Sequence, residues 1–353
     1  MVTPLGPRAV PSPHLIETAR SAWGLGPATG AMDLGGTYNL NLRLQTLGDP
    51  VVLRVYRPWV SPDRLAATQA IRTGLRDLGL PVVAPLPARS GKMAVTVDGR
   101  LAEIEPWLPD DGGTDDRDRL LVAAELLGRL HAGLRAVRPS GPIVPAPVSN
   151  DLSPRVFDDW LARTARAVGA VPRSDDTVVA ERACRDAEGI ARNARTFRRG
   201  RNRRGHQLVH GDYGHENVRF TGLVATAIVD VDFLHEGERI VDLADLAFSP
   251  HWMSEFGQID LPPAQRDWDI VSALIRRYDA AGAGVRPLSM NEIEALPLAM
   301  AAVPLNWLAA SWLLEDPVAA VCLVAPELAT AAWLVEHHRE LAVRWPAACS
   351  TPF

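Results

Sequence analysis

A short polar loop enclosed by apolar segments, at residues 207–220, constrains the fold of this chain more than any other feature. It reads Gln-Leu-Val-His-Gly-Asp-Tyr-Gly-His-Glu-Asn-Val-Arg-Phe, and a further apolar run at 224–229 follows a Thr-Gly turn. Short apolar runs separated by polar turns are typical of β-strands. We therefore expect short strands whose ends carry Asp212, Asn217 and Asp230 to a common point.

These strand ends offer two carboxylates and one amide, a set suited to phosphoryl transfer. A carboxylate can orient an attacking alcohol and accept its proton, while amide and carboxylate oxygens can hold Mg²⁺ against phosphate groups. In such reactions the protein contributes mostly position and charge rather than covalent chemistry. A polar hairpin with capping carboxylates is the alternative interpretation of the same residues.

The whole ordered set of polar residues resembles the aminoglycoside phosphotransferase and choline kinase family, whose members have the protein-kinase-like fold. The family pattern is His-Gly-Asp, then Asn, then Asp about a dozen residues later, then Asp-Leu-Ala; it is matched by His210, Asp212, Asn217, Asp230 and Asp242. The resemblance implies that Asp212 is the catalytic base and that Asn217 and Asp230 are Mg²⁺ ligands. It also implies that His210 and Asp242 support the catalytic loop.

Beyond this loop, the chain changes from a β-rich first third to a mostly helical remainder. Its length of 353 residues favours two lobes or two domains over a single small core. With the resemblance, these features predict an α+β, two-lobed protein-kinase-like fold. We expect a small β-rich N-terminal nucleotide-binding lobe at residues 1–105 and a larger, mostly helical C-terminal lobe for catalysis and substrate binding at residues 106–353.

Local patterns predict individual elements of both lobes. Apolar spacing predicts a helix within 11–25, another over 62–78 and a third from Leu120 onward. A Gly-Asp-Pro turn at 48–50 and an Asp-Gly turn at 98–99 each predict a pair of strands.

Within the first lobe, the resemblance implies the groups that contact a nucleotide. Gly35, Gly36 and Asn39 lie in the segment where the family has its nucleotide-covering loop. Arg54 falls where the family has a Lys or Arg that touches the α- and β-phosphates, although a solvated strand arginine would look the same. The segment at 104–109 resembles the family's hinge, so backbone groups near Glu105 and Trp107 are expected to contact adenine.

Two features of the sequence leave details of this site open. The helix at 62–78 has Gln69 where the family offers a Glu to the phosphate-binding cation, so Arg54 is expected to have a weaker, neutral partner there. Asp232 follows Asp230 by two residues. If the strand continues, we expect Asp232 to point to the opposite side, and it ranks only as a second choice of metal ligand.

The composition argues against several classes of protein. Lys and Arg number 37 against 42 Asp and Glu, a net charge of −5, so we expect no nucleic-acid partner. The three cysteines have no paired spacing and the first ten residues carry no secretory signal, which together predict a reducing, cytoplasmic location. The uncharged stretch at 295–314 is long enough to span a membrane, but its two prolines would break a spanning helix and favour buried helices instead.

Several other polar and aromatic residues have simple structural explanations. The basic run at 192–204 is typical of a solvated helix end and loop, with attraction of an anionic substrate as the alternative. His131 lies on the apolar face of its helix, which predicts a buried structural role. Core packing is favoured over a substrate pocket for Trp307, Trp312 and Trp333.

The residues and the resemblance together predict an enzyme that uses ATP and Mg²⁺ to phosphorylate a hydroxyl group of a small molecule. The preferred acceptor is an antibiotic or another secondary metabolite, phosphorylated for resistance or self-protection; a primary metabolite such as homoserine, choline or a sugar is the alternative. Gln69 and Arg54 also motivate a different class of function, a nucleotide- or substrate-binding protein without catalysis. The sequence leaves open the acceptor, the choice between ATP and GTP, and the oligomeric state.

Overall fold

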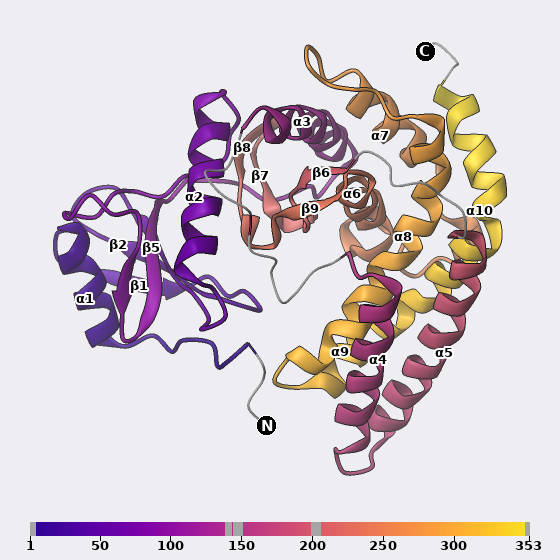
Figure 1. The fold of residues 1–353 in the computed structure, drawn as a ribbon, viewed down its shortest axis with the longest axis horizontal. Coiled ribbons are helices and arrows are strands. Elements are labelled where there is room, and N and C mark those ends of the chain that lie inside the picture. The colour runs from indigo at the N-terminus through magenta and orange to yellow at the C-terminus, as the bar shows by residue number, and fades with distance from the viewer. Residues whose placement is uncertain (1–4, 138–142, 144–150, 199–205, 350–353) are drawn as a thin grey trace.

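The computed structural model of the chain describes residues 5–137, 143, 151–198 and 206–349. A lobe built on a β-sheet lies on the left of Figure 1 and a larger helical lobe on the right, with four short strands between them. The sequence-based prediction of an α+β, two-lobed fold is confirmed.

The first lobe contains one antiparallel sheet with the strand order β1-β2-β3-β5-β4. Its strands are β1 (Gly30–Asp33), β2 (Leu40–Gln45), β3 (Val51–Val55), β4 (Val95–Val97) and β5 (Arg100–Pro106). Leu42 of β2 pairs with Leu53 of β3, which pairs with Ile104 of β5, so one face of the sheet carries a row of buried aliphatic side chains. The strand pairs expected around 48–50 and 98–99 are both present.

Two capped helices accompany this sheet. Helix α1 (Pro13–Trp23) begins where the Ser12 side chain accepts a hydrogen bond from the Leu15 amide, and it ends at Gly24 with a φ of 70°. Helix α2 (Pro62–Asp77) begins in the same way at Ser61. The apolar face of α1 packs into the core of the sheet. The helices expected within 11–25 and over 62–78 therefore form.

The second lobe is mostly helical. Its helices are α3 (Arg117–Ala136), α4 (Pro154–Gly169), α5 (Asp175–Arg198), α6 (Ile240–Trp252), α7 (Asp269–Asp279), α8 (Met290–Ala310), α9 (Pro317–Val324) and α10 (Leu328–Cys349). Short 3₁₀ turns lie at His215–Asn217, Val231–Phe233, Ser254–Phe256, Pro263–Gln265, Ser311–Leu313 and Ala325–Glu327. The helices share one large apolar core, against which Trp307, Trp312 and Trp333 pack.

Four short strands carry the loop that dominates the sequence. They form two antiparallel pairs: β6 (His206–Val209) with β9 (His235–Glu238), and β7 (Val218–Thr221) with β8 (Val224–Ile228). The strand expected from Asn217 begins one residue later, because Asn217 closes a 3₁₀ turn. The strand expected to reach Val229 ends at Ile228.

Two helical stretches of the described chain are long and apolar enough to span a membrane, Met290–Leu313 and Pro317–Pro346. In their most apolar windows, 67% and 50% of the residues are buried inside the fold, as in the core helices of soluble proteins. The expectation that prolines would break the first stretch is wrong, because α8 continues through Pro297 and Pro304. Packing of α8 against α4, α6 and α10 compensates for the hydrogen bonds that these prolines cannot donate.

Candidate active site

A cavity of about 380 Å³ lies between the sheet of the first lobe and the β7–β8 hairpin, within the size range of small-molecule sites. The first lobe lines it with Gly35, Gly36 and Arg54, and the second lobe with Asn217 and Asp230. Backbone bonds join the two sides, since the Ile228 amide donates to the Pro81 carbonyl at 2.6 Å and the Val83 amide to the Ile228 carbonyl at 3.2 Å. These bonds fix one wall of the cavity relative to the other.

The loop after β6 presents Asp212 at its turn. Gly211 has a φ of 82°, and a Cβ atom there would lie 2.5 Å from the Phe233 carbonyl oxygen, so only glycine fits. The Asn217 side-chain amide donates to both the backbone oxygen of Asp212, at 2.7 Å, and its Oδ2 atom, at 3.0 Å. This arrangement fixes the Asp212 carboxylate and uses the NH₂ group of Asn217, so that its Oδ1 atom is the part of the side chain left to accept a ligand.

Asp230 follows β8 and is brought next to Asn217 by the backbone. The Val229 amide donates to the Asn217 carbonyl at 2.9 Å, which holds the two strand ends together. Asp230 has the left-handed values of φ 56° and ψ 56°, a conformation that Asp and Asn adopt more readily than other side chains. Its side chain is 36% exposed and lines the cavity. The three predicted residues of the polar loop are thus brought into one neighbourhood.

Asp232 does not point to the opposite side from Asp230, and the strand continuation on which that prediction depended is absent. Arg54 Nη2 lies 2.8 Å from Asp232 Oδ2 and 3.2 Å from Asp230 Oδ1, so one guanidinium contacts both carboxylates. Residues two apart in a strand share a face, and here the strand has already ended at Ile228, with the chain turning into the 3₁₀ turn Val231–Phe233.

The two carboxylates differ in their charge. Burial alone would raise the pKa of Asp230, but the charge of Arg54 and hydrogen bonds from Arg54 and Asp232 keep it below its usual range. Burial, together with the neighbouring Asp230 charge, raises the pKa of Asp232 to about 7 despite the opposing effect of Arg54. Asp230 is therefore the more readily ionised member of the pair and the better cation ligand, while a pKa of about 7 leaves Asp232 partly ionised at neutral pH.

The expected supports of the loop form a buried hydrogen-bond network. Asp242, in the first turn of α6, accepts from the amides of His210 and Gly211, each at 2.8 Å, and from His131 Nε2 at 2.9 Å. His131 Nδ1 meets the Tyr278 hydroxyl at 2.8 Å. His210 in turn donates through Nε2 to the Val229 carbonyl at 3.1 Å. The buried structural position predicted for His131 is observed.

The glycines of the 34–39 loop lie where a ligand can approach the backbone. Gly35 and Gly36 have φ values of 80° and 104° and both line the cavity. Asn39, expected in the same group of contacts, instead donates through its side chain to Asp232 and accepts from the Arg57 amide at 3.0 Å. It is 3% exposed, so its observed contacts hold the loop rather than face the cavity.

Gln69 does not contact Arg54 as expected. It donates to Glu103 at 2.6 Å, and Glu103 also accepts from Arg72 at 2.5 Å. Arg72 additionally bonds Glu105 at 2.5 Å, which places Glu105 within 3.9 Å of Arg54. The partners of Arg54 therefore come from the strand β5 and from the segment after β8, not from helix α2.

The two predicted hinge residues, Glu105 and Trp107, also have specific contacts in the structure. Glu105 is 5% exposed, and burial raises its pKa to about 7 although Arg72 and Arg54 oppose the shift. The Trp107 amide already donates to the Pro50 carbonyl at 3.2 Å, and the Arg43 guanidinium lies 4.6 Å from the centre of the Trp107 ring. Both residues line the cavity. Because the Trp107 amide is already bonded to Pro50, the predicted adenine contacts depend on other backbone atoms of 104–109.

The oxygen donors around Asn217 and Asp230 fit Mg²⁺, which prefers one or two carboxylates completed by water and phosphate oxygens. Among the described residues, no three His, Cys, Asp or Glu side chains lie close enough to hold a metal by themselves. A cation here would therefore depend on oxygen atoms supplied by a bound phosphate compound, because Asp230 and the Oδ1 atom of Asn217 provide only part of a coordination shell.

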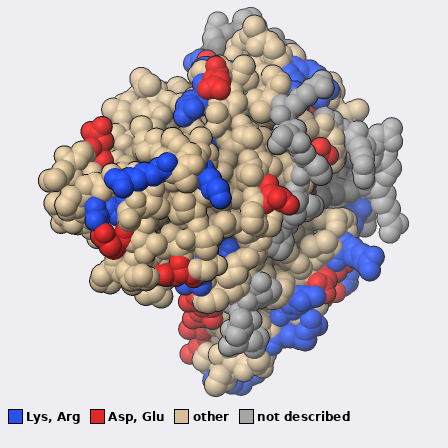
Figure 2. All heavy atoms as spheres, turned by 60° about the vertical axis from the view of Figure 1, so that its left-hand side comes forward, with Lys and Arg blue, Asp and Glu red and all other residues tan. Residues whose placement is uncertain are grey.

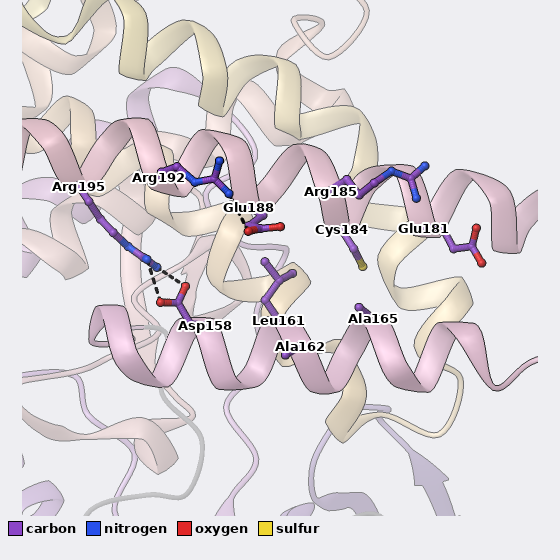
Figure 3. A pocket seen from close by; sticks show the side chains of 10 residues that line it. All are labelled: Asp158, Leu161, Ala162, Ala165, Glu181, Cys184, Arg185, Glu188, Arg192 and Arg195. Atoms are coloured by element: carbon purple, nitrogen blue, oxygen red, sulfur yellow. Dashed lines mark hydrogen bonds and ion pairs between the residues drawn. The ribbon is translucent and has the colours of Figure 1, made fainter.

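The basic run is largely paired where the structure describes it. Arg195 of α5 holds Asp158 of α4 with two hydrogen bonds of 2.6 and 2.8 Å, and Arg192 bonds Glu188 at 2.7 Å, beside a groove between the two helices (Figure 3). These contacts support the interpretation of the basic run as the solvated end of a helix. On the face that Figure 2 shows, basic side chains are scattered among acidic and uncharged ones. The arginines at 199–204 lie outside the described residues.

Sequence reasoning missed Asp245, one turn after Asp242 in α6. It is 6% exposed, and its Oδ2 atom has no hydrogen-bond partner among the described residues. Burial, followed by the charges of Asp212, Asp242 and Asp151, raises its pKa well above the usual range. A buried carboxyl group whose surroundings favour its neutral form therefore lies near the catalytic loop, and its only sequence signal was the second Asp in Asp-Leu-Ala-Asp-Leu.

Comparison with known proteins identifies the family. The model of the phosphotransferase enzyme family matches residues 33–282, which include both walls of the cavity. The chain belongs to this family. Homoserine kinase of Phenylobacterium zucineum (strain HLK1) is 27% identical over 271 residues, covering 74% of this chain and 73% of that protein. Homoserine kinase of Caulobacter sp. (strain K31) is 26% identical over 74% of each chain.

Solved structures share the fold at low sequence identity. An amicoumacin kinase in complex with AMP-PNP, Ca²⁺ and amicoumacin has a TM-score of 0.64 at 13% identity, over 89% of this chain and 92% of that one. A microcompartment-associated aminopropanol kinase has a TM-score of 0.62 at 17% identity, over 93% and 98%. Spectinomycin phosphotransferase with ADP and spectinomycin has a TM-score of 0.61 at 11% identity, over 92% and 99%.

Proposed function

We propose that this protein transfers the γ-phosphate of ATP, with Mg²⁺, to a hydroxyl group of a small molecule. The observation that carries the proposal is that Asn217 and Asp230 meet Arg54 at one cavity, while the Asn217 side chain also holds the Asp212 carboxylate. Membership of the phosphotransferase enzyme family supports it.

In this mechanism each described residue has a separate task. Asp212, fixed by the Asn217 amide, orients the acceptor hydroxyl in line with the γ-phosphorus and accepts its proton. Asp230 and the Oδ1 atom of Asn217 would hold Mg²⁺, which neutralises phosphate charge in such reactions. Arg54 and the glycine backbone at 35–36 hold the phosphates, and the residues near 105–107 hold adenine.

Two classes of acceptor compete within this proposal. An antibiotic or another secondary metabolite is the preference from sequence, and the family membership accommodates it. Homoserine is the second candidate, because two homoserine kinases align with about three quarters of the chain at 27% and 26% identity. The buried acid Asp245 beside the catalytic loop does not favour one class of acceptor over the other.

A coupled assay for ADP release tests the function and ranks the acceptors. Purified protein with ATP and Mg²⁺ is offered homoserine, choline, aminopropanol, spectinomycin and amicoumacin in turn, and kcat/KM is compared. We expect turnover with at least one hydroxyl compound, and its loss when EDTA removes the divalent cation. Asp212→Ala is the matched control. If the wild type is as inert as this variant on every acceptor while ATP still binds, the chain is a binding protein instead.

A further inference from the structure

Arg54 is the only predicted phosphate-binding cation in the first lobe, and its position depends on carboxylates of the second. Its side chain is 6% exposed and reaches from β3 to Asp232 at 2.8 Å and to Asp230 at 3.2 Å. Glu105 is farther away, at 3.9 Å. Since Arg54 Nε has no hydrogen-bond partner among the described residues, the guanidinium retains a donor that these carboxylates do not use.

The carboxylates around Arg54 are not equally free to hold it. Glu105 is bonded to Arg72 at 2.5 Å. Asp230, 36% exposed in the cavity, is the residue that a bound cation would engage under the proposed function. Asp232 is 10% exposed. A cation that takes the Asp230 oxygens would therefore leave Asp232 as the remaining close carboxylate of Arg54.

Asp232 is itself held from three directions by the first lobe. Asn39, in the loop between β1 and β2, donates to its Oδ2 atom. Arg64 of α2 donates to its backbone oxygen and, at 3.1 Å, to the carbonyl of Leu234. With Arg54 from β3, three separate elements of the sheet lobe converge on this one residue. A side chain fixed in this way can in turn fix the flexible end of an arginine.

We propose that Asp232 is a positioning residue, which holds Arg54 in the cleft so that the guanidinium meets the nucleotide phosphates when Asp230 is engaged by a cation. Helix α2 cannot perform this task, because its Gln69 is bonded to Glu103. The inference rests on the proposed function, since it requires a phosphate compound in the cavity. It extends that function by assigning a role to a carboxylate that does not line the cavity.

The test measures nucleotide binding without turnover. ADP affinity is determined by calorimetry in Mg²⁺ and without an acceptor for the wild type, Asp232→Asn, Arg54→Met and the double variant, with unfolding temperatures measured in parallel. Loss of a charge-assisted contact to Arg54 is expected to weaken ADP binding about 10-fold in Asp232→Asn. In the Arg54→Met background the same change is expected to have less than about a 2-fold effect, because Asp232 acts through Arg54. Exposed Asp77→Asn is the matched control and should bind ADP like the wild type.

Kinetics give a second readout on the active protein. KM for ATP should rise about as much as the dissociation constant, while kcat and KM for the acceptor stay within about 3-fold. Equal ADP affinity in wild type and Asp232→Asn, or independent effects in the double variant, would overturn the positioning role and leave the proposed function intact. A wild type that binds no ADP would overturn both.

A second variant keeps the test decisive if Asp232→Asn does not fold. Asn39→Ala keeps every charge and removes one group that holds Asp232. It is expected to weaken ADP binding about 3-fold, again only when Arg54 is present. An Asn39→Ala protein with the ADP affinity of the wild type would then contradict the inference.

Discussion

Two groups of buried charges meet the catalytic strands from opposite sides, and they are organised differently. Behind the loop, Asp242 is 0% exposed and accepts hydrogen bonds from two backbone amides and His131. In front of it, Arg54 contacts Asp230 and Asp232, while Asp230 remains 36% exposed. Both oxygens of the Asp242 carboxylate are satisfied within the protein, whereas the Asp230 carboxylate keeps exposed surface in the cavity that a ligand can use.

A supporting carboxylate and a candidate catalytic one differ here in how many of their oxygen atoms lack protein partners, and not in residue type. Buried carboxylates occur in both groups, and burial opposes ionisation in both. Asp242 nevertheless keeps a pKa below its usual range, because the opposing effect of burial is outweighed by the His131 hydrogen bond, the nearby histidines and the Gly211 amide. A fully bonded carboxylate is a scaffold, and an incompletely bonded one at a cavity is a candidate ligand.

The largest effect is expected on kcat, from a substitution on the front side of the loop. Asp212→Ala should lower kcat about 1,000-fold, because a positioned base is removed, while the thermal unfolding temperature changes little. The measurement is steady-state kinetics with the best acceptor, beside a melting curve. A large drop in unfolding temperature would move Asp212 into the supporting group.

At the rear, Asp242→Asn should lower stability by about 3 kcal/mol and lower activity with it. The single NH₂ group of Asn would face the backbone amide of either His210 or Gly211, donor against donor, at a fully buried position. Urea unfolding measures the stability. A stable Asp242→Asn protein with reduced kcat would contradict the supporting role.

A buried histidine in the helical lobe predicts how the stability of that lobe depends on pH. Burial lowers the pKa of His251 to about 3, and Arg266 adds to the shift. The unfolded chain takes up this proton near pH 6.5, so the native state loses stability as pH falls below that value. Between pH 7 and pH 5 the loss from this group is about 2 kcal/mol. His251→Phe should flatten the pH dependence of urea unfolding by that amount, and unchanged slopes would contradict the assignment.

The smallest effect is expected where the rear network leads away from the loop. The Tyr278 hydroxyl bridges His131 and Arg239, with Arg239 Nη1 at 3.1 Å. Tyr278→Phe should cost about 1 kcal/mol of stability and leave KM for ATP unchanged. Urea unfolding and nucleotide kinetics check the two parts, and a raised KM would show that the front and rear groups are coupled.

The sequence predicted the parts of this molecule that depend on short-range patterns. Turn residues and apolar spacing located the hairpins around 48–50 and 98–99 and the helices of the first lobe, and the polar loop located Asp212, Asn217 and Asp230. The roles of those three residues stay predictions until activity is measured.

What the sequence did not predict depends on contacts between distant segments. Gln69 meets Glu103 rather than Arg54, and Asn39 meets Asp232, 193 positions away. No local pattern encodes such pairs, because the first is decided by how α2 packs on the sheet and the second by how the two lobes pack. The side to which Asp232 points was missed because residues two apart in a strand share a face, so even a continuing strand would not have placed Asp230 and Asp232 on opposite sides. The backbone after β8 in fact turns at the left-handed residue Asp230.

That left-handed residue limits which replacements can occur at the cation site. At φ 56°, Asp230 occupies a conformation that β-branched and long side chains enter only with strain, while Asn and Gly enter it easily. A lineage that abandoned catalysis through Asn or Gly here would keep its architecture and could persist as a binder. Replacement by Glu, which preserves the carboxylate, would add about 1 kcal/mol of backbone strain, so backbone shape as well as metal chemistry favours Asp at this position.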